Sequence, residues 1–270
     1  MPLSLSHRFR PLAAALTCTI ALTACANVTE ADISFSNYGA VTITGKNAPA
    51  GRGTATVNAV FFRGLSANAP NSALQQGDQC SYAVIDSLTG AGTGSLRAGD
   101  NLLLTIAGTN VAMPFSSARL RYEPLTDIAL TYAAGDAATL NVPGAPGIFP
   151  AASISVKLAE PIFPGPLVIP AAGSPLNVTW NATNDATSAI IVSVRYGATP
   201  TATVPNEQIY CALKDDGAFL LPAAGLGAFL SSPSALRSVT LVRWRTQEVR
   251  PSDVSLLHVV TTVDTVVRFP

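Results

Sequence analysis

Charged residues are scarce in this chain: they make up 12% of its 270 residues, about half the share of an average soluble domain. The chain contains three lysines, and its net charge of 0 becomes −2 if the first 24 residues, which include Arg8 and Arg10, are removed. Nucleic-acid binding requires clustered basic side chains that displace counterions, so this composition argues against it. We interpret the one basic cluster as a solvated strand face: Arg237, Arg243, Arg245 and Arg250.

The residue types that usually carry catalysis are also few. Of two histidines, His7 lies in the N-terminal segment, and His258 lies in an apolar strand where we expect a polar partner in the core or at the surface. The sequence has neither a nucleophile elbow nor a phosphate-binding loop. Catalytic zinc normally takes three protein ligands that include histidine. We therefore predict that the protein is not an enzyme and has no catalytic residue, metal site or cofactor.

Paired carboxylates are the remaining route to hydrolysis, and Asp215-Asp216 is the only adjacent acidic pair. Followed by Gly217, this pair fits an Asp-Gly hairpin turn. Neighbouring residues on a strand face opposite sides, so the two carboxylates are not expected to flank one substrate bond. An unorthodox carboxylate site would need acids that are distant in sequence, such as Asp253 or Asp264.

The N-terminus has the pattern of an export signal. Arg8 and Arg10 form a short basic region, and an uncharged apolar stretch follows over residues 12–22. This stretch is too short to span a bilayer, which takes about 20 apolar residues. Residues 1–24 are therefore predicted to be a signal peptide.

The end of that segment, Leu22-Thr23-Ala24-Cys25, resembles the lipobox of bacterial lipoproteins. The resemblance implies that the Cys25 thiol carries a lipid and that Cys25 becomes the new N-terminus. The protein is then anchored to the membrane of the cell envelope. Because Ala26 rather than aspartate follows the cysteine, the resemblance also implies delivery to an outer membrane. The motif covers four residues, and its position after an apolar stretch is what makes it specific.

An alternative cleavage site overlaps the lipobox. Ala24-Cys25-Ala26 also fits an ordinary signal peptidase, which would release a free periplasmic or secreted protein that begins at Asn27. Either cleavage leaves Cys80 and Cys211 as the remaining cysteines. An oxidising compartment favours a disulfide between them, which would close a loop of about 130 residues. The alternative is two buried reduced thiols, which we favour because the two cysteines fall in different predicted domains.

The mature part is dominated by period-2 alternation of apolar and polar residues, which predicts an all-β fold. A proline-rich passage over residues 160–172 predicts a linker between two Ig-like β-sandwich domains, residues 25–159 and 173–270. Proline at position 222 and the apolar spacing after it predict one short helix over 219–230. The expected strands cover residues 33–38, 40–44, 54–62, 81–86, 102–107, 119–122, 139–142, 153–158, 176–180, 188–196, 209–213, 238–245 and 254–268.

A second resemblance concerns about 40 residues of the C-terminal half. A strand with Cys211, the Asp215-Asp216-Gly217 turn, a helix that begins at Pro222 and an arginine-bearing strand follow one another. This order resembles uncharacterised bacterial envelope proteins and implies no known activity.

Together these features predict a non-enzymatic envelope lipoprotein with a structural or protein-binding role. The alternative is a surface module that binds polysaccharide. It requires an exposed row of aromatic residues on one sheet face, formed by Trp180, Tyr196, Tyr210 and Trp244.

Overall fold

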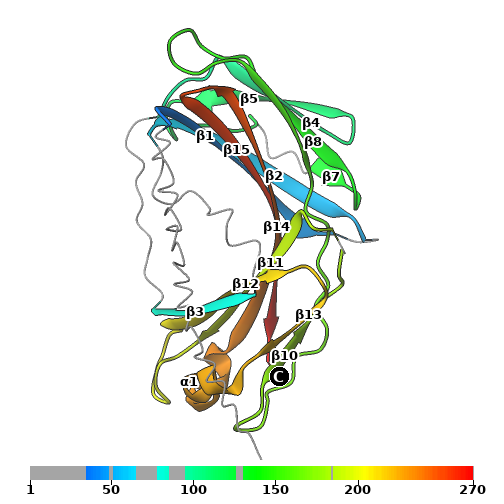
Figure 1. The fold of residues 1–270 in the computed structure, drawn as a ribbon, viewed down its shortest axis with the longest axis vertical. Helices are drawn as coiled ribbons and strands as arrows, with labels where there is room; N and C mark the ends of the chain where they lie inside the picture. Colours follow the sequence, from blue (N-terminus) through cyan, green and yellow to red (C-terminus); the bar gives the residue numbers. More distant parts are fainter. Residues whose placement is uncertain are drawn as a thin grey trace, which may run out of the picture. The chain divides into compact units, whose positions relative to one another are not determined.

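A computed structural model describes residues 35–48, 51–64, 78–84, 95–125, 130–183 and 185–269. The predicted signal peptide and Cys25 lie outside these residues. The described chain consists of strands joined by turns, with one short α-helix, so the all-β prediction is confirmed (Figure 1). The elements are β1 (Asn37–Asn47), β2 (Gly53–Arg63), β3 (Gln79–Val84), β4 (Asn101–Ile106), β5 (Thr109–Ser116), β6 (Arg121–Tyr122), β7 (Leu130–Tyr132), β8 (Ala137–Val142), β9 (Ala152–Lys157), β10 (Leu176–Thr179), β11 (Ser188–Tyr196), β12 (Glu207–Lys214), β13 (Ala218–Leu221), α1 (Gly227–Ser231), β14 (Ser238–Ser252) and β15 (Ser255–Arg268).

Among the described residues, one sheet contains 13 of the strands. Its order is β3-β12-β11-β14-β15-β1-β2-β6-β5-β4-β8-β9, and β7 also pairs with β2. The remaining strands, β10 and β13, form a separate antiparallel pair. Strands from both halves of the sequence therefore share one hydrogen-bonded ladder.

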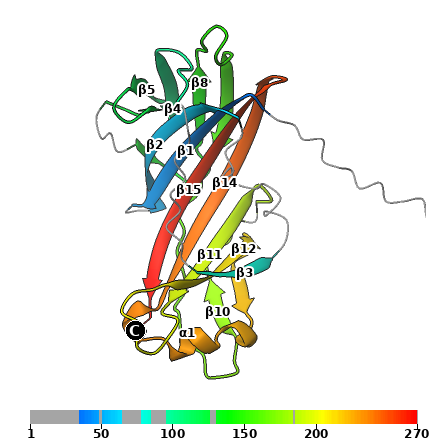
Figure 2. The ribbon, with the colours of Figure 1, turned by 90° about the vertical axis from the view of Figure 1, so that its left-hand side faces the viewer.

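The hairpin of β14 and β15 joins the two halves. The first part of β14, Ser238 to Arg245, pairs with β11. The first part of β15, Ser255 to Asp264, pairs in parallel with β1. Figure 2 shows both long strands running from the β1 and β2 region to the β11 and β12 region. Because the hairpin is longer than either neighbour, its two ends can belong to different parts of the same sheet.

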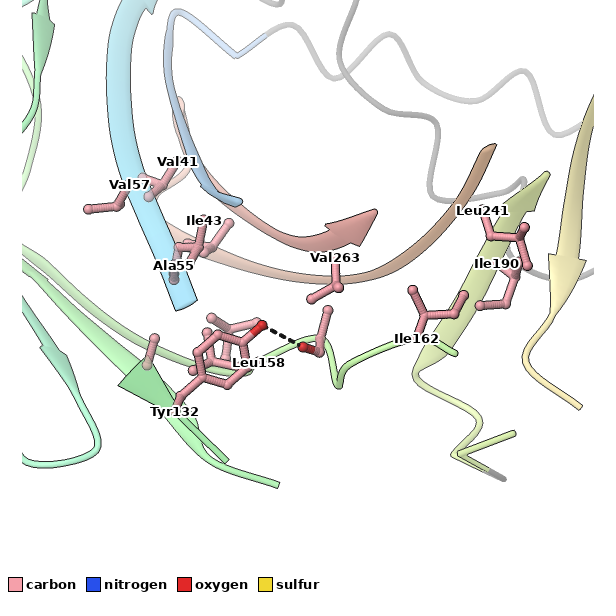
Figure 3. Close-up of a cluster of buried hydrophobic side chains, with 14 of the residues drawn as sticks. Val41, Ile43, Ala55, Val57, Tyr132, Leu158, Ile162, Ile190, Leu241 and Val263 are labelled. Carbon is pink, nitrogen blue, oxygen red and sulfur yellow. Dashed lines mark hydrogen bonds between the residues drawn. The ribbon is translucent and has the colours of Figure 1, made fainter. Parts of the chain in front are cut away.

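Alternation along these strands creates the core. From Gly39 to Gly45 on β1 and from Gly53 to Phe61 on β2, residues with odd numbers are buried, and the even-numbered residues between them are more exposed. Successive strand side chains face opposite sides, so this period places one apolar row on the inner face. The apolar row belongs to a single hydrophobic cluster that also includes residues of β11, β14 and β15. Figure 3 shows part of this cluster, with Val41, Ile43, Val57, Ile190 and Leu241 among the side chains drawn.

The division into two sandwich domains is not confirmed, because the described strands form one sheet within a single compact unit, residues 34–270. Residues 160–172 do not behave as a free linker. Ile162 is fully buried, and its backbone N–H and carbonyl both bond to the side chain of Asn47 at the end of β1. The prolines prevent a helix or central strand here, as expected. They do not prevent the passage from packing against the core.

Several local predictions also need correction. β1 joins the end of the expected strand 33–38, whose first two residues lie outside the described residues, to the expected strand 40–44. β5 and β7 were missed. The predicted helix over 219–230 begins instead with β13, and α1 follows only after Gly225. Glycines at 225 and 227 disfavour a longer helix here.

Candidate functional site

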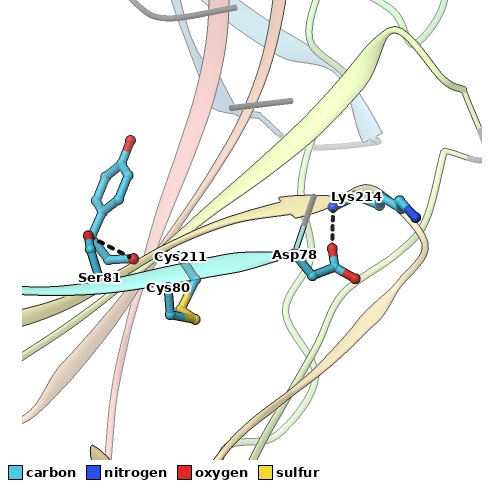
Figure 4. Close-up of a disulfide and its surroundings, with 6 residues drawn as sticks. Asp78, Cys80, Ser81, Cys211 and Lys214 are labelled. Atoms are coloured by element: carbon cyan, nitrogen blue, oxygen red, sulfur yellow. Dashed lines mark hydrogen bonds between the residues drawn. A yellow bond between two sulfur atoms is a disulfide. The ribbon is translucent and has the colours of Figure 1, made fainter. Parts of the chain in front are cut away.

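The two cysteines in the described part of the chain form a disulfide bond. Cys80 on β3 and Cys211 on β12 face each other across the antiparallel ladder, with their Cα atoms 4.0 Å apart, and form a disulfide (Figure 4). The preference for two reduced thiols is therefore corrected. It depended on placing the cysteines in different domains, whereas β3 pairs directly with β12. Asp78 supports the same junction by accepting a hydrogen bond from the backbone N–H of Lys214.

Two of the four arginines in the basic cluster contradict the sequence-based interpretation, whereas Arg237 is half-buried and Arg250 is exposed. Arg243 and Arg245 are 0% and 1% exposed, although we expected a solvated strand face. Both have odd numbers, as do Val239 and Leu241, so they lie on the inner face of β14. Buried arginines are tolerated when they are paired and hydrogen-bonded. Their partners are acidic residues and carbonyl groups that are remote in sequence.

Arg243 forms a buried ion pair with Asp215. Its Nε lies 2.8 Å from Asp215 Oδ2, and its Nη2 donates to Oδ1 at 3.1 Å. The remaining guanidinium hydrogens reach the carbonyl oxygens of Glu160, Pro161 and Asn181. Every nitrogen of the Arg243 guanidinium thus has an acceptor within the chain.

The Asp215 carboxylate is also satisfied from its other side, by Trp180 Nε1 at 2.9 Å, Thr183 Oγ1 at 2.9 Å and Ser188 Oγ at 2.6 Å. Burial by itself would raise the pKa of Asp215. The hydrogen bonds from Arg243 and Ser188 outweigh burial and hold the pKa below its usual value. Asp215 is therefore ionised and fully engaged within the chain.

Arg245 extends the network towards the surface. Its Nη2 bonds both carboxylate oxygens of Glu160, at 2.7 and 2.8 Å, and its Nη1 bonds Asp185 at 2.9 Å. Lys157 completes the set by donating to Asp185 at 2.7 Å. Hydrogen bonds from Lys157 and Thr187 lower the pKa of Asp185 well below its usual range. The network connects β14 with residues 157–161, 180–183, 185–188 and 215, so it holds the connecting segments on the sheet.

The two carboxylates of the acidic pair lie in different surroundings. Asp215 is buried and Asp216 is exposed, as the opposite-face argument predicted. The Asp-Gly turn connects β12 to β13, but β13 pairs with β10, so the turn is not a hairpin. Neither Asp253 nor Asp264 is among the hydrogen-bond partners of Asp215.

His258 lies on the face of β15 that points away from the main hydrophobic core, beside a small cluster formed by Phe35, Tyr38 and Leu256. It is 2% exposed, and its Nδ1 lies 3.0 Å from the Tyr38 hydroxyl and 3.4 Å from a carboxylate oxygen of Glu248. Burial lowers the pKa of His258 and raises that of Tyr38 to about 12. The imidazole is therefore neutral at pH 7. Within the described residues its Nε2 has no hydrogen-bond partner.

The four aromatics proposed as a sugar-binding row do not form one. Trp180, Tyr196 and Trp244 are buried, and Tyr210 is half-buried. Tyr196 and Tyr210 lie on opposite faces of their sheet, since Tyr196 joins the inner cluster and Tyr210 alternates with the buried Cys211. The polysaccharide alternative therefore loses the feature on which it depended.

A solvent-open cavity lies elsewhere, between β2, β5, β6 and β7, and has a volume of about 700 Å³. Its lining combines polar strand residues with arginines and apolar side chains: Thr56, Val57, Asn58, Pro114, Phe115, Ser116, Arg119, Arg121, Glu123, Pro124, Leu125 and Leu130. Sequence reasoning did not identify this site. The alternation Arg119-Leu-Arg121-Tyr-Glu123, which places three charges on one face, is the signal that could have found it.

The charged residues that line the cavity are two arginines and one glutamate. Arg119 Nη1 donates to both oxygens of Glu123 at 3.0 Å, and Arg121 Nε donates to one of them at 2.8 Å. Partial burial would raise the pKa of Glu123, but the hydrogen bonds from both arginines outweigh burial and lower the pKa. Two cations thus share one carboxylate, and the cavity lining carries a net positive charge.

Metal-ligand clusters and membrane-spanning helices are absent from the residues that the structure describes. No group of His, Cys, Asp or Glu side chains in this part of the chain is arranged to hold a metal ion. Its helices are all too short or too polar to cross a membrane. No protein-family model, curated protein or solved structure matches the chain.

Proposed function

We propose that this chain is a non-enzymatic protein of the bacterial cell envelope that acts by binding a partner protein. In this proposal the signal peptide exports it and a lipid on Cys25 holds it on the membrane. The observation that carries the binding role is the cationic cavity between β2 and β7, which is open to solvent and has an apolar side.

The disulfide supports export. Structural disulfides persist in oxidising compartments and are rare in the reducing cytosol. The Cys80–Cys211 bond fixes the edge strand β3 to β12, and it closes a long loop with a sequence separation of 131. An exported protein would form and keep such a bond.

The buried charges support a role without catalysis. Asp215, Arg243 and Arg245, the most enclosed ionic groups in the described chain, are engaged by neighbouring side chains and carbonyls. General acid–base catalysis requires a group that can reach a substrate proton. These groups stabilise the fold instead, which leaves the surface cavity for recognition.

Lipid attachment is tested with the full chain expressed in a Gram-negative bacterium that is fed a clickable palmitate analogue. The wild-type protein and the control Cys18→Ser, which alters a cysteine within the signal peptide, should incorporate the label and remain with membranes. Cys25→Ser should lose both properties. A wild-type protein that is unlabelled and has Asn27 as its N-terminus by intact mass would instead support the freely secreted alternative.

Partner binding is tested in the same cells with a photo-crosslinking amino acid at position 125, which lines the cavity. The matched control carries it at position 220, which is similarly apolar and exposed but lies on β13. We expect a discrete crosslinked protein from position 125 and none from position 220. The same pattern of adducts from both positions, or no adduct from position 125, would contradict a binding role for the cavity.

A further inference from the structure

The cavity exists because strand pairing is interrupted on one edge of β2. Residues Gly53–Ala55 pair with β7, and Ala59 pairs with Tyr122 of β6. Between these two contacts, Thr56, Val57 and Asn58 have no strand partner on this edge among the described residues, although they all pair with β1 on the other. Figure 1 shows β2 and β7 beside each other in this region.

Along this interruption, no described strand supplies partners to the backbone groups of β2. Backbone N–H and carbonyl groups are obligatory hydrogen-bonding groups, and a strand edge presents them in a row. Extended peptides bind such edges by adding hydrogen bonds in the manner of a further strand. The gap on β2 spans three residues, so it matches a short extended segment rather than a complete strand.

The charge at the cavity selects the sign of the ligand. Arg119 and Arg121 together direct their bonds to the one carboxylate of Glu123. In the part of the chain that the structure describes, Nη1 and Nη2 of Arg121 have no acceptor. A guanidinium binds a second carboxylate readily, because its planar fork of donors matches two oxygens.

The apolar side of the cavity distinguishes a peptide from a sugar. Leu125 is 86% exposed at the cavity, and Pro124 lies beside it. The aromatic ring in the lining, Phe115, already has the guanidinium of Arg97 at 5.2 Å from its centroid. That contact occupies one ring face that a sugar would need for stacking, whereas an exposed leucine favours an aliphatic side chain.

We infer that this cavity binds a short extended segment of the partner protein in which an acidic residue is flanked by aliphatic residues. The carboxylate lies against Arg119 and Arg121, the aliphatic side chain lies on Leu125 and Pro124, and the segment's backbone bonds to the edge of β2 that no described strand pairs with. This inference rests on the proposed binding function and specifies the chemistry of the partner.

The test uses the purified mature protein and a phage-displayed library of random peptides about seven residues long, which span about 23 Å when extended. Peptides selected by the wild-type protein should be enriched in aspartate or glutamate next to leucine, isoleucine or valine. The best selected peptide is then titrated by fluorescence anisotropy. Replacing its acidic residue with the corresponding amide should weaken binding about tenfold or more, as expected for a hydrogen bond between charged groups.

Variants locate the binding site. Arg121→Gln should weaken binding of the selected peptide about tenfold or more, and Leu125→Ser should weaken it by a smaller factor. The control Arg195→Gln removes an exposed arginine on β11 and should leave binding unchanged. Unchanged melting temperatures in all three variants would show that the losses are not caused by unfolding.

Three outcomes would overturn the inference: no enrichment of acidic peptides, equal binding by Arg121→Gln, or binding of digalacturonic acid in place of any peptide. The crosslinking experiment in cells distinguishes these outcomes from a failure of the proposed function. If position 125 still crosslinks a discrete protein in cells, the cavity binds a partner and only the assigned chemistry is wrong. If crosslinking and peptide selection both fail, the proposed binding function fails with the inference.

Discussion

Replacing Arg243 with methionine tests whether the buried charge network holds the fold together. The substitution keeps an unbranched apolar stem and removes the guanidinium. Asp215 then lies in the interior without its cation, where burial raises its pKa, and the carbonyls of Glu160, Pro161 and Asn181 lose their donor. Removing only one partner of a buried ion pair is strongly destabilising, because the other partner stays buried without its counter-charge.

Removing one partner from a buried ion pair costs about 3–5 kcal/mol. Each buried carbonyl left without a donor adds about 1 kcal/mol or more, less whatever water can restore. We therefore expect Arg243→Met to lower the free energy of unfolding by at least about 4 kcal/mol. Natural domains have about 5–15 kcal/mol in total, so the variant should be near the limit of folding at 37 °C.

Urea unfolding, followed by tryptophan fluorescence with the disulfide intact, measures this loss. Trp180 donates directly to Asp215, so its emission reports on the site. The control is Arg195→Gln, because exposed substitutions usually change stability by less than about 0.5 kcal/mol. The double variant Asp215→Leu with Arg243→Met should lose less than the two single variants added together, since no unpaired charge remains.

Acid provides a second measurement on the same pair. The pKa of Asp215 is lower in the folded protein than its ordinary value of about 3.9. Its contribution to stability is therefore complete above about pH 4 and is lost as the pH falls through the folded pKa. Asp215→Asn should weaken this part of the acid dependence. If Arg243→Met costs less than about 1 kcal/mol, or Asp215→Asn leaves the acid dependence unchanged, the network does not stabilise the fold as argued.

Two further predictions concern the disulfide and the buried histidine. In denatured mature protein, Cys80 and Cys211 should react with maleimide only after reduction, and labelling without reductant would contradict the pairing. Because the disulfide closes a loop with a sequence separation of 131, its reduction should lower the free energy of unfolding by up to about 5 kcal/mol. His258 should titrate below its ordinary pKa of about 6.5 when its imidazole is followed by NMR, because burial lowers its pKa. Its contribution to stability should be complete above about pH 6.5 and be lost as the pH falls towards the folded pKa, and His258→Gln should remove that loss. A His258 pKa at or above 6.5 would contradict its burial.

Alternation located most of the strands but did not show which strands pair. The pattern located β2, β11 and most of β15 within a few residues, because a half-buried strand must alternate. It could not show that β1 pairs in parallel with β15 or that β3 pairs with β12. Those pairings join residues more than 100 positions apart, and nothing in a local period encodes them.

The same limit explains the errors about charge. Arg243 and Arg245 alternate with the inner-face residues of β14, so the period alone placed them in the core. We interpreted them as solvated because buried arginines need partners, and their partners Asp215, Glu160 and Asp185 are far away in sequence. Arg119 and Arg121 were missed as site residues for a related reason, since the cavity depends on where β6 and β7 leave β2.

The sequence by itself indicated most of the β-strands and the apolar rows along them, because each depends on neighbouring residues. It also predicts an export signal and a lipid on Cys25, and both lie outside the described residues and stay predictions. Only the tertiary structure decided the single large sheet, the Cys80–Cys211 bond, the buried ion pairs and the cationic cavity. Each of these requires segments that are distant in the chain to meet, and that meeting is set by the packing of the whole core rather than by any local pattern.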